Sequence, residues 1–161
     1  MTLTTALVAV LLIAAAAGFL AFRRARRLRG AGGRLNSLPS YHAFYAAMWS
    51  ALPALLIVAL YIPVESRLVD NAVLASAEGR ALPAFEMQRV TILNEAREIA
   101  HGDRDVGFNP ESTALAPRIL EAEGRYGALG GGIAILAALA GAGLALRRVG
   151  LDFRARAGVE R

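Results

Sequence analysis

The side chains best suited to chemistry in this chain are two histidines and the acids near one of them. His101 is followed by Asp103 and Asp105, and an imidazole with two carboxylates could bind a divalent cation weakly. His42 stands among aromatic residues at the start of an apolar stretch, where a solvated or hydrogen-bonded imidazole is expected. A metal site needs several convergent ligands, and the chain has neither cysteine nor an HxxxH spacing. We therefore expect a solvated turn at His101 and predict no metal-binding residue.

Other catalytic and cofactor-binding patterns are also missing from the sequence. The glycine clusters Gly30–Gly33 and Gly130–Gly132 lack the lysine and the preceding strand of a phosphate-binding loop. Asp103 and Asp105 lack the buried surroundings that would shift a pKa, and no serine or threonine stands in a nucleophile elbow. We predict no catalytic residue, no cofactor-binding residue and no cofactor, and we expect that the chain is not an enzyme.

The strongest pattern is a set of three long stretches without any charged residue. They are Leu3–Phe22, Tyr41–Val64 and Gly127–Leu146. At ~1.5 Å rise per residue, about 20 helical residues cross the ~30 Å hydrocarbon layer of a membrane. The sequence therefore predicts an all-α membrane protein with three transmembrane helices and a small helical extracytoplasmic segment between the second and third. Because ion pathways place ionisable groups at depth, these spans alone are not expected to form one.

The charges are sorted by sign between these stretches. The first linker carries six arginines and no acid, and the segment between the second and third stretches has a net charge of −4. Arg-rich flanks remain cytoplasmic, which places the N-terminus outside and the C-terminus inside. The total charge of +5 could suggest nucleic acid, but topology explains it and we predict no nucleic-acid partner.

The predicted organisation has six parts. The first apolar stretch is read as a retained helix rather than a cleaved signal peptide, because its arginines follow it. The parts are a transmembrane helix at residues 1–22, a cytoplasmic Arg-rich linker at 23–40, a second transmembrane helix at 41–64, a periplasmic helical loop at 65–126, a third transmembrane helix at 127–146 and a cytoplasmic Arg-rich tail at 147–161.

Shorter signals indicate structure inside these parts. The second span is predicted to continue as a helix through Ser66–Ala77. A separate helix with an apolar face is predicted to begin at Pro83, and a last helix near Pro117. The apolar face is assigned to Phe85, Ile92, Leu93, Ala96, Ile99 and Ala100, with Glu95, Arg97 and Glu98 near the C-terminal half of the helix.

Glycine, proline and tyrosine residues suggest how the spans are built. Gly127 and Gly131 have the GxxxG spacing, which either permits close helix packing or arises by chance in an Ala/Gly-rich span. Pro53 is expected to kink the second span, and Tyr41 and Tyr45 fit its membrane interface.

Two segments resemble a known family of membrane proteins. The segments are residues 35–42 (LNSLPSYH), followed by Trp49 and residues 52–56 (LPALL), and the C-terminal run 152–161 (DFRARAGVER). They are similar to the N-terminal extension of PstC-type permease subunits of phosphate ABC importers and to the hinge that precedes the permease core. Ala157 departs from that pattern, where the family has Asn.

The resemblance implies that the chain is the membrane-anchoring or assembly part of a permease subunit, with the permease core missing. It further implies a second, PstA-type permease subunit, a cytoplasmic PstB-type ATPase and a periplasmic phosphate-binding protein as partners, besides the lipid bilayer. No pathway or coupling residue is carried over, because those parts lie downstream in the family. The alternative is a stand-alone membrane sensor or adaptor that uses its periplasmic helical loop to bind a partner.

Overall fold

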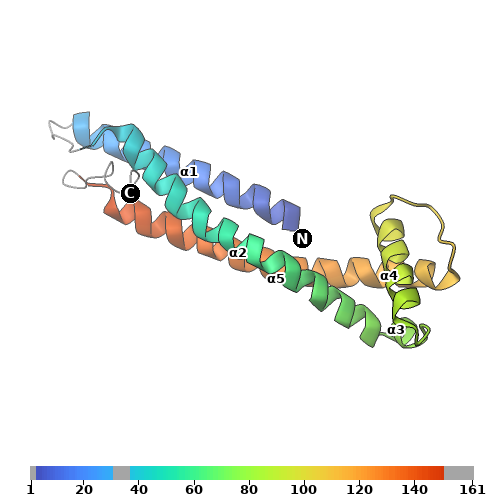
Figure 1. Ribbon diagram of the computed structural model, residues 1–161. Helices are drawn as coiled ribbons and strands as arrows, with labels where there is room; N and C mark the ends of the chain where they lie inside the picture. The colour runs from blue at the N-terminus through green and yellow to red at the C-terminus, as the bar shows by residue number, and fades with distance from the viewer. Residues whose placement is uncertain (1–2, 31–36, 151–161) are drawn as a thin grey trace. The chain divides into compact units, whose positions relative to one another are not determined.

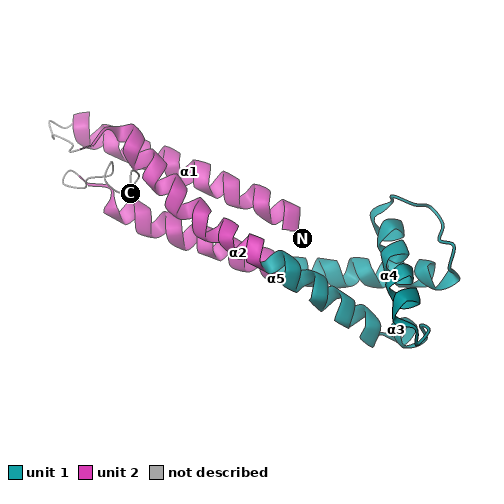
Figure 2. Cartoon of the chain, viewed as in Figure 1, with its two compact units in different colours: residues 1–2, 61–129 teal, residues 3–60, 130–161 magenta. Residues whose placement is uncertain are grey.

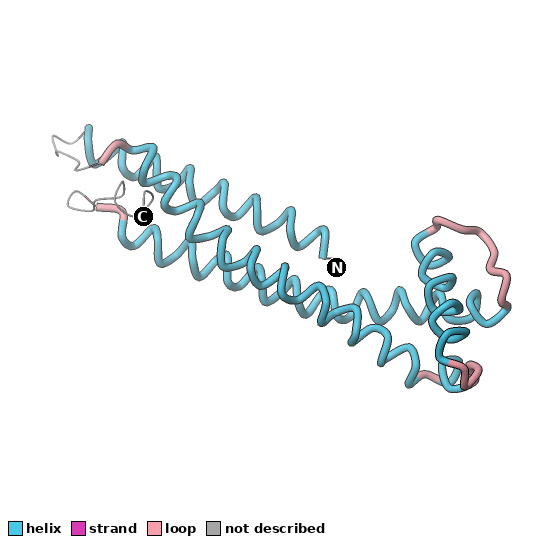
Figure 3. The backbone as a smooth tube through the Cα atoms, in the orientation of Figure 1, coloured by secondary structure: helices cyan, strands magenta, loops and turns pink. Residues whose placement is uncertain are grey.

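The computed structural model describes residues 3–30 and 37–150, and the regular structure in these two ranges is helical, without a strand (Figures 1 and 3). The all-α prediction is confirmed. Predictions that concern Gly32, Gly33, Arg34 and residues 151–161 lie outside the described residues, as do the first two positions of the segment 35–42. The helices are α1 (Leu3–Gly30), α2 (Pro39–Ala75), α3 (Ala77–Arg80), α4 (Glu86–His101) and α5 (Pro110–Arg148).

Three of these helices, α1, α2 and α5, are long and apolar enough to cross a membrane. Each contains one of the predicted spans and extends beyond it. Helix α1 continues through the first arginines and ends at Gly30, since Arg is a good helix former and Gly is not. Its last turn carries Arg27 and Arg29, which complement the negative end of the helix dipole.

The chain divides into two compact units (Figure 2). Among the described residues, unit 1 comprises 61–129, and unit 2 comprises 3–30, 37–60 and 130–150. Unit 1 therefore contains α3, α4 and the adjoining parts of α2 and α5. Unit 2 contains α1 and the remaining parts of α2 and α5.

Alanines fill the interior of unit 2, where α1, α2 and α5 pack along one another (Figure 2). Ala21, Ala46 and Ala138 are completely buried, and their small side chains let the helix backbones approach closely. The closest approach involves Gly141: a Cβ there would collide with the carbonyl oxygen of Trp49 and lie 3.2 Å from the Cα of Ser50. Close packing of α5 against α2 thus depends on a missing side chain.

Branched aliphatic side chains fill the core of unit 1. Ile92 of α4 and Leu115 and Ile119 of α5 are at most 1% exposed. They pack with Val69 and Val73 of α2 in one cluster. This pattern is typical of a core that forms in water, where burial of bulky apolar side chains drives folding.

The expected boundaries inside unit 1 need two corrections. Helix α4 begins at Glu86 rather than Pro83, and Phe85 is its N-cap residue. Phe85 is 77% exposed, so it does not belong to the buried face of this helix.

Helix α5 begins at Pro110 rather than Pro117. Pro117 lies inside the helix, where its ring removes one backbone donor. Both Pro117 and Thr113 are exposed, so water can hydrate the carbonyl group that loses its partner. An internal proline is therefore tolerated at this position.

Candidate functional site

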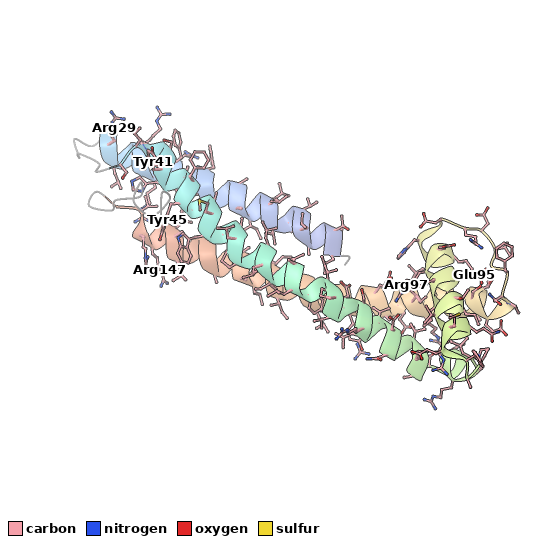
Figure 4. All side chains as sticks on the ribbon, in the orientation of Figure 1. Arg29, Tyr41, Tyr45, Glu95, Arg97 and Arg147 are labelled. Atoms are coloured by element: carbon pink, nitrogen blue, oxygen red, sulfur yellow. The ribbon has the colours of Figure 1, made fainter. Side chains whose placement is uncertain are left out.

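A buried carboxylate organises one end of unit 1. Glu95, in the C-terminal half of α4, is 6% exposed. Its carboxylate accepts hydrogen bonds from the backbone N–H of Phe108, from the backbone N–H of Asn109 at 3.2 Å and from the Asn109 side-chain amide at 2.8 Å. The donors belong to the loop that leads into α5, and Figure 4 shows Glu95 on the side of α4 that faces this loop.

These contacts keep Glu95 ionised. The hydrogen bond from the Asn109 side chain is the largest cause that lowers the pKa of Glu95 below its usual 4.5, and the backbone donors add to it. Burial opposes the shift without reversing it. Arg104 lies 3.5 Å from the same carboxylate. A carboxylate with a lowered pKa and this many donors holds a loop in place and is poorly suited to act as a general acid.

The loop begins where α4 ends. Gly102 has a φ of 79°, in the left-handed region that favours glycine. The N–H of Gly102 donates to the Ile99 carbonyl at 3.1 Å, and the N–H of Asp103 donates to the Glu98 carbonyl at 2.8 Å. Gly102 thus stops the helix and turns the chain toward Asn109.

Ion pairs on the surface of unit 1 join its helices. Arg97 of α4 pairs with Asp70 of α2 (Figure 4 labels Arg97), and Arg118 of α5 pairs with Glu78 of α3 at 3.1 Å. The hydrogen bond from Arg118 is the main reason that the pKa of Glu78 is lowered. Solvent-exposed pairs of this kind contribute little to stability. Their arrangement indicates a structural role.

The histidine and acids considered as weak metal ligands are not gathered in one place. The Nε2 of His101 lies 2.9 Å from Glu123 of α5, and Asp103 and Asp105 are exposed. Within residues 3–30 and 37–150, no group of three or more histidines and acids is arranged to hold a metal ion. His101 therefore joins α4 to α5.

Unit 1 also contains an open cavity of ≈ 210 Å³ between α2 and α5. Arg118 lies in its wall, where it is within 3.3 Å of Glu121 and also pairs with Glu78. Both acids therefore balance the charge of Arg118, whereas the second arginine in the wall, Arg125, lies over the Tyr126 ring at 5.9 Å. The lining residues of the cavity are Ala72, Val73, Ser76, Arg118, Glu121, Ala122, Arg125 and Tyr126.

The polar residues of unit 2 connect helices. The Ser50 hydroxyl of α2 donates to the Ala138 carbonyl of α5 at 3.0 Å, within the interior. At the Arg-rich end, Arg24 of α1 donates to the Leu146 carbonyl at 3.3 Å, and Arg148 donates to the Tyr45 hydroxyl at 3.3 Å. The Ser50 contact could not be predicted, because a single serine in an apolar span has no distinctive neighbours in the sequence.

Two aromatic residues of the expected interface lie inside unit 2. His42 is completely buried, so it is not the solvated one of its two expected states, solvated or hydrogen-bonded, and Tyr45 is 5% exposed. Figure 4 shows Tyr41 and Tyr45 near Arg29 and Arg147 at one end of unit 2. The aromatic residues at this end thus include interior packing groups as well as surface groups.

Comparison with known proteins gives one match. Residues 7–161 match a family described as "Phosphate ATP-binding cassette transporter". No curated protein and no solved structure matches the chain. The family implies partnership with other transporter components, and the three long apolar helices agree with a membrane component. Because the match covers nearly the whole sequence, the chain belongs to this family of phosphate ATP-binding cassette transporters.

Proposed function

We propose that this chain is the N-terminal membrane-anchoring and assembly part of a permease subunit of an ATP-driven phosphate importer. The observation that carries the proposal is a family match over residues 7–161 of a chain with three helices able to cross a membrane. The resemblance of residues 35–42 to PstC-type subunits supports the assignment to the permease.

An anchoring role fits the chemistry of the three spans better than a pathway for phosphate. Residues 3–22, 41–64 and 127–146 contain no acid and no arginine. A path for a multivalent anion through the membrane requires ionisable or polar groups at depth. The buried Ser50 hydroxyl in this region is already bonded to a backbone carbonyl of the neighbouring helix. We therefore assign the three spans to anchoring, as helices that pack against one another. The core of the permease provides the path for phosphate.

The proposal includes an orientation and a set of partners. The arginines at the ends of α1 and α5 lie on the cytoplasmic side of the inner membrane, and unit 1 and the N-terminus lie in the periplasm. The permease core pairs with a second permease subunit and a cytoplasmic ATPase, and a periplasmic phosphate-binding protein delivers the substrate.

The first test is the mass of the native protein, purified from its own membranes with an antibody against residues 66–125. We expect a mass well above the 17.0 kDa of this chain, because the permease core should be attached. The second test deletes residues 1–148 from that longer protein. Assembly with the partner subunits should fall, while ATPase coupling of the correctly assembled fraction is retained. Complete loss of coupling in that fraction would contradict an anchoring role.

A stand-alone sensor or adaptor is a second candidate, because unit 1 exposes apolar side chains on α4. Met87 is 80% exposed and Val90 is 51% exposed, and residues three apart on a helix share one face, so the two side chains together offer an apolar contact to a partner. Glutamate at both positions should abolish capture of membrane partners by the full chain. Unchanged capture, or a native mass far above 17.0 kDa, would eliminate this candidate.

A further inference from the structure

We propose that unit 2 carries a binding site for one anionic phospholipid, between α1 and α2 at the Arg-rich end. The site consists of two adjoining parts that share Phe22 and Ser40. One part is a cavity lined by arginines, which we call the headgroup cavity. The other is an apolar groove, which we call the acyl groove.

The headgroup cavity has a volume of ≈ 480 Å³ and is open on one side. Arg26 and Arg29 of α1 line it, together with Ser40 in the first turn of α2. Two guanidinium groups and a hydroxyl are donors suited to phosphate oxygens. The positive end of the α2 dipole adds to the attraction for an anion.

The acyl groove continues along α1 and α2 with a volume of ≈ 260 Å³. Its floor is formed by small residues: a Cβ at Gly18 would lie 3.2 Å from the Ala43 carbonyl oxygen and 3.5 Å from the Ala47 Cβ. Phe19 and Phe44 form its walls and are 59% and 63% exposed. A narrow apolar channel with aromatic sides suits a hydrocarbon chain.

The arginines of this region have no acidic partner in the described part of unit 2. Residues 3–30, 37–60 and 130–150 contain neither aspartate nor glutamate. Arg26 stacks over the ring of Phe22, with 5.8 Å between the guanidinium carbon and the ring centroid, and Arg23 stacks over Phe19 at 5.6 Å. The rings support the arginine stems at the interface while the charges stay available. No side chain in the described part of unit 2 therefore supplies a counter-charge to these arginines.

A phospholipid fits these observations better than a free anion. Inorganic phosphate would use only the headgroup cavity and would leave the adjoining apolar groove unexplained. An anionic lipid places its phosphate between Arg26 and Arg29 and one acyl chain between Phe19 and Phe44. Each arginine near a membrane surface raises the affinity for anionic lipid about fivefold.

The test is native mass spectrometry of the full chain after detergent delipidation, with phosphatidylglycerol, phosphatidylethanolamine or inorganic phosphate added back. We expect one phosphatidylglycerol per chain, held at least about tenfold more tightly than phosphatidylethanolamine. The R26Q/R29Q variant should lose about 30-fold in affinity for phosphatidylglycerol. The matched control is R27Q/R147Q, which removes the same charge from the same end of unit 2 but leaves the headgroup cavity intact.

A second pair of variants tests the acyl groove. Ala15 lines the groove, whereas the adjacent Ala16 does not, and both are exposed. A15F should fill the groove and weaken phosphatidylglycerol binding, while A16F should leave it unchanged. If R26Q/R29Q and R27Q/R147Q lost the same affinity for phosphatidylglycerol, the lipid would be attracted by the total positive charge of this end rather than by a specific site, and the proposal would be overturned. Binding of inorganic phosphate as tight as that of the lipid, unaffected by A15F, would overturn the lipid assignment.

Discussion

Unit 1 and unit 2 are both helical, but their interiors are built from different residues. Unit 1 buries Ile, Leu and Val and carries many ion pairs, whereas unit 2 buries mostly alanine and has no acid among its described residues. Both units expose large apolar side chains, such as Met87 in unit 1 and Leu136 in unit 2. In water, burial of bulky apolar groups drives folding. In lipid that drive is absent, and close backbone packing and interhelical hydrogen bonds replace it. The difference indicates that the two units are built for two different solvents.

The largest effect is expected from emptying the core of unit 1. Ile92 is 1% exposed, and I92A should destabilise unit 1 by about 2–5 kcal/mol through lost burial and a residual cavity. Hydrogen exchange of the α4 amides measures the loss. V90A, on the exposed side of the same helix, is the matched control and should change exchange little. If I92A and V90A changed the exchange of the α4 amides to a similar extent, the interior of unit 1 would not be a core stabilised by burying apolar side chains from water.

The second prediction tests what surrounds the exposed residues of each unit. Leu136 is 67% exposed and lies near the middle of the third predicted span. L136R should oppose membrane insertion by about 3 kcal/mol, because a charge at the centre of a span loses its hydration. A glycosylation-based insertion assay measures this.

The matched change in unit 1 is M87R, at a residue that is 80% exposed. It should leave insertion unaffected, because arginine at a water-exposed position remains hydrated. If L136R inserted as well as M87R, the exposed apolar side chains of unit 2 would not be in contact with lipid.

The third prediction concerns packing through a missing side chain. G141L should separate α5 from α2 at a cost of about 1–3 kcal/mol, because the nearest obstacle is the backbone of Trp49 rather than a flexible side chain. Disulfide crosslinking between cysteines introduced into α2 and α5 measures the separation. G143L is the control, since a Cβ at Gly143 meets nothing within 4 Å. Retained crosslinking in G141L would show that this contact does not control the packing.

The smallest effect is expected from acid. The folded pKa of Glu95 lies below its usual 4.5, so its stabilising contribution is present above 4.5 and is lost as the pH falls through the lowered value. The Asn109 side-chain amide signal in NMR should report this titration. E95Q should remove the response, and E98Q, at an exposed acid of the same helix, should retain it. A response that persisted in E95Q would assign the titration to another group.

The main outline of the fold was predictable because transmembrane length and the absence of charge are strong signals. They identified the three stretches that became parts of α1, α2 and α5. The exact ends were not predictable: α1 continues past Phe22 to Gly30, and α5 begins at Pro110 rather than Pro117. A stretch without charge marks the part of a helix that can lie in lipid, not the end of the helix, and Pro110 and Pro117 are equally compatible with a first helical turn.

Individual contacts were less predictable than helices. Glu95 is three residues after Ile92 and one before Ala96, so its spacing did place it on the apolar face of α4. Its burial as a carboxylate could not be predicted, because the two backbone donors that compensate for it belong to a loop 13 and 14 residues away. The Gly141 contact was missed for the same reason, since Trp49 lies in another helix. GxxxG spacing directed attention to Gly127 and Gly131, whose role in packing stays a prediction.

The positive end of unit 2 has one further property, which follows from its being built from arginine alone. All 18 basic residues of the chain are arginines, and a guanidinium group keeps its proton throughout the physiological pH range. It also lacks the amine that lysine acetylation modifies. The positive charge at this end of α1 and α5 is therefore permanent, and the cell cannot switch it off by acidification or acetylation. Only ionic strength and the share of anionic lipid in the membrane remain to adjust its effect.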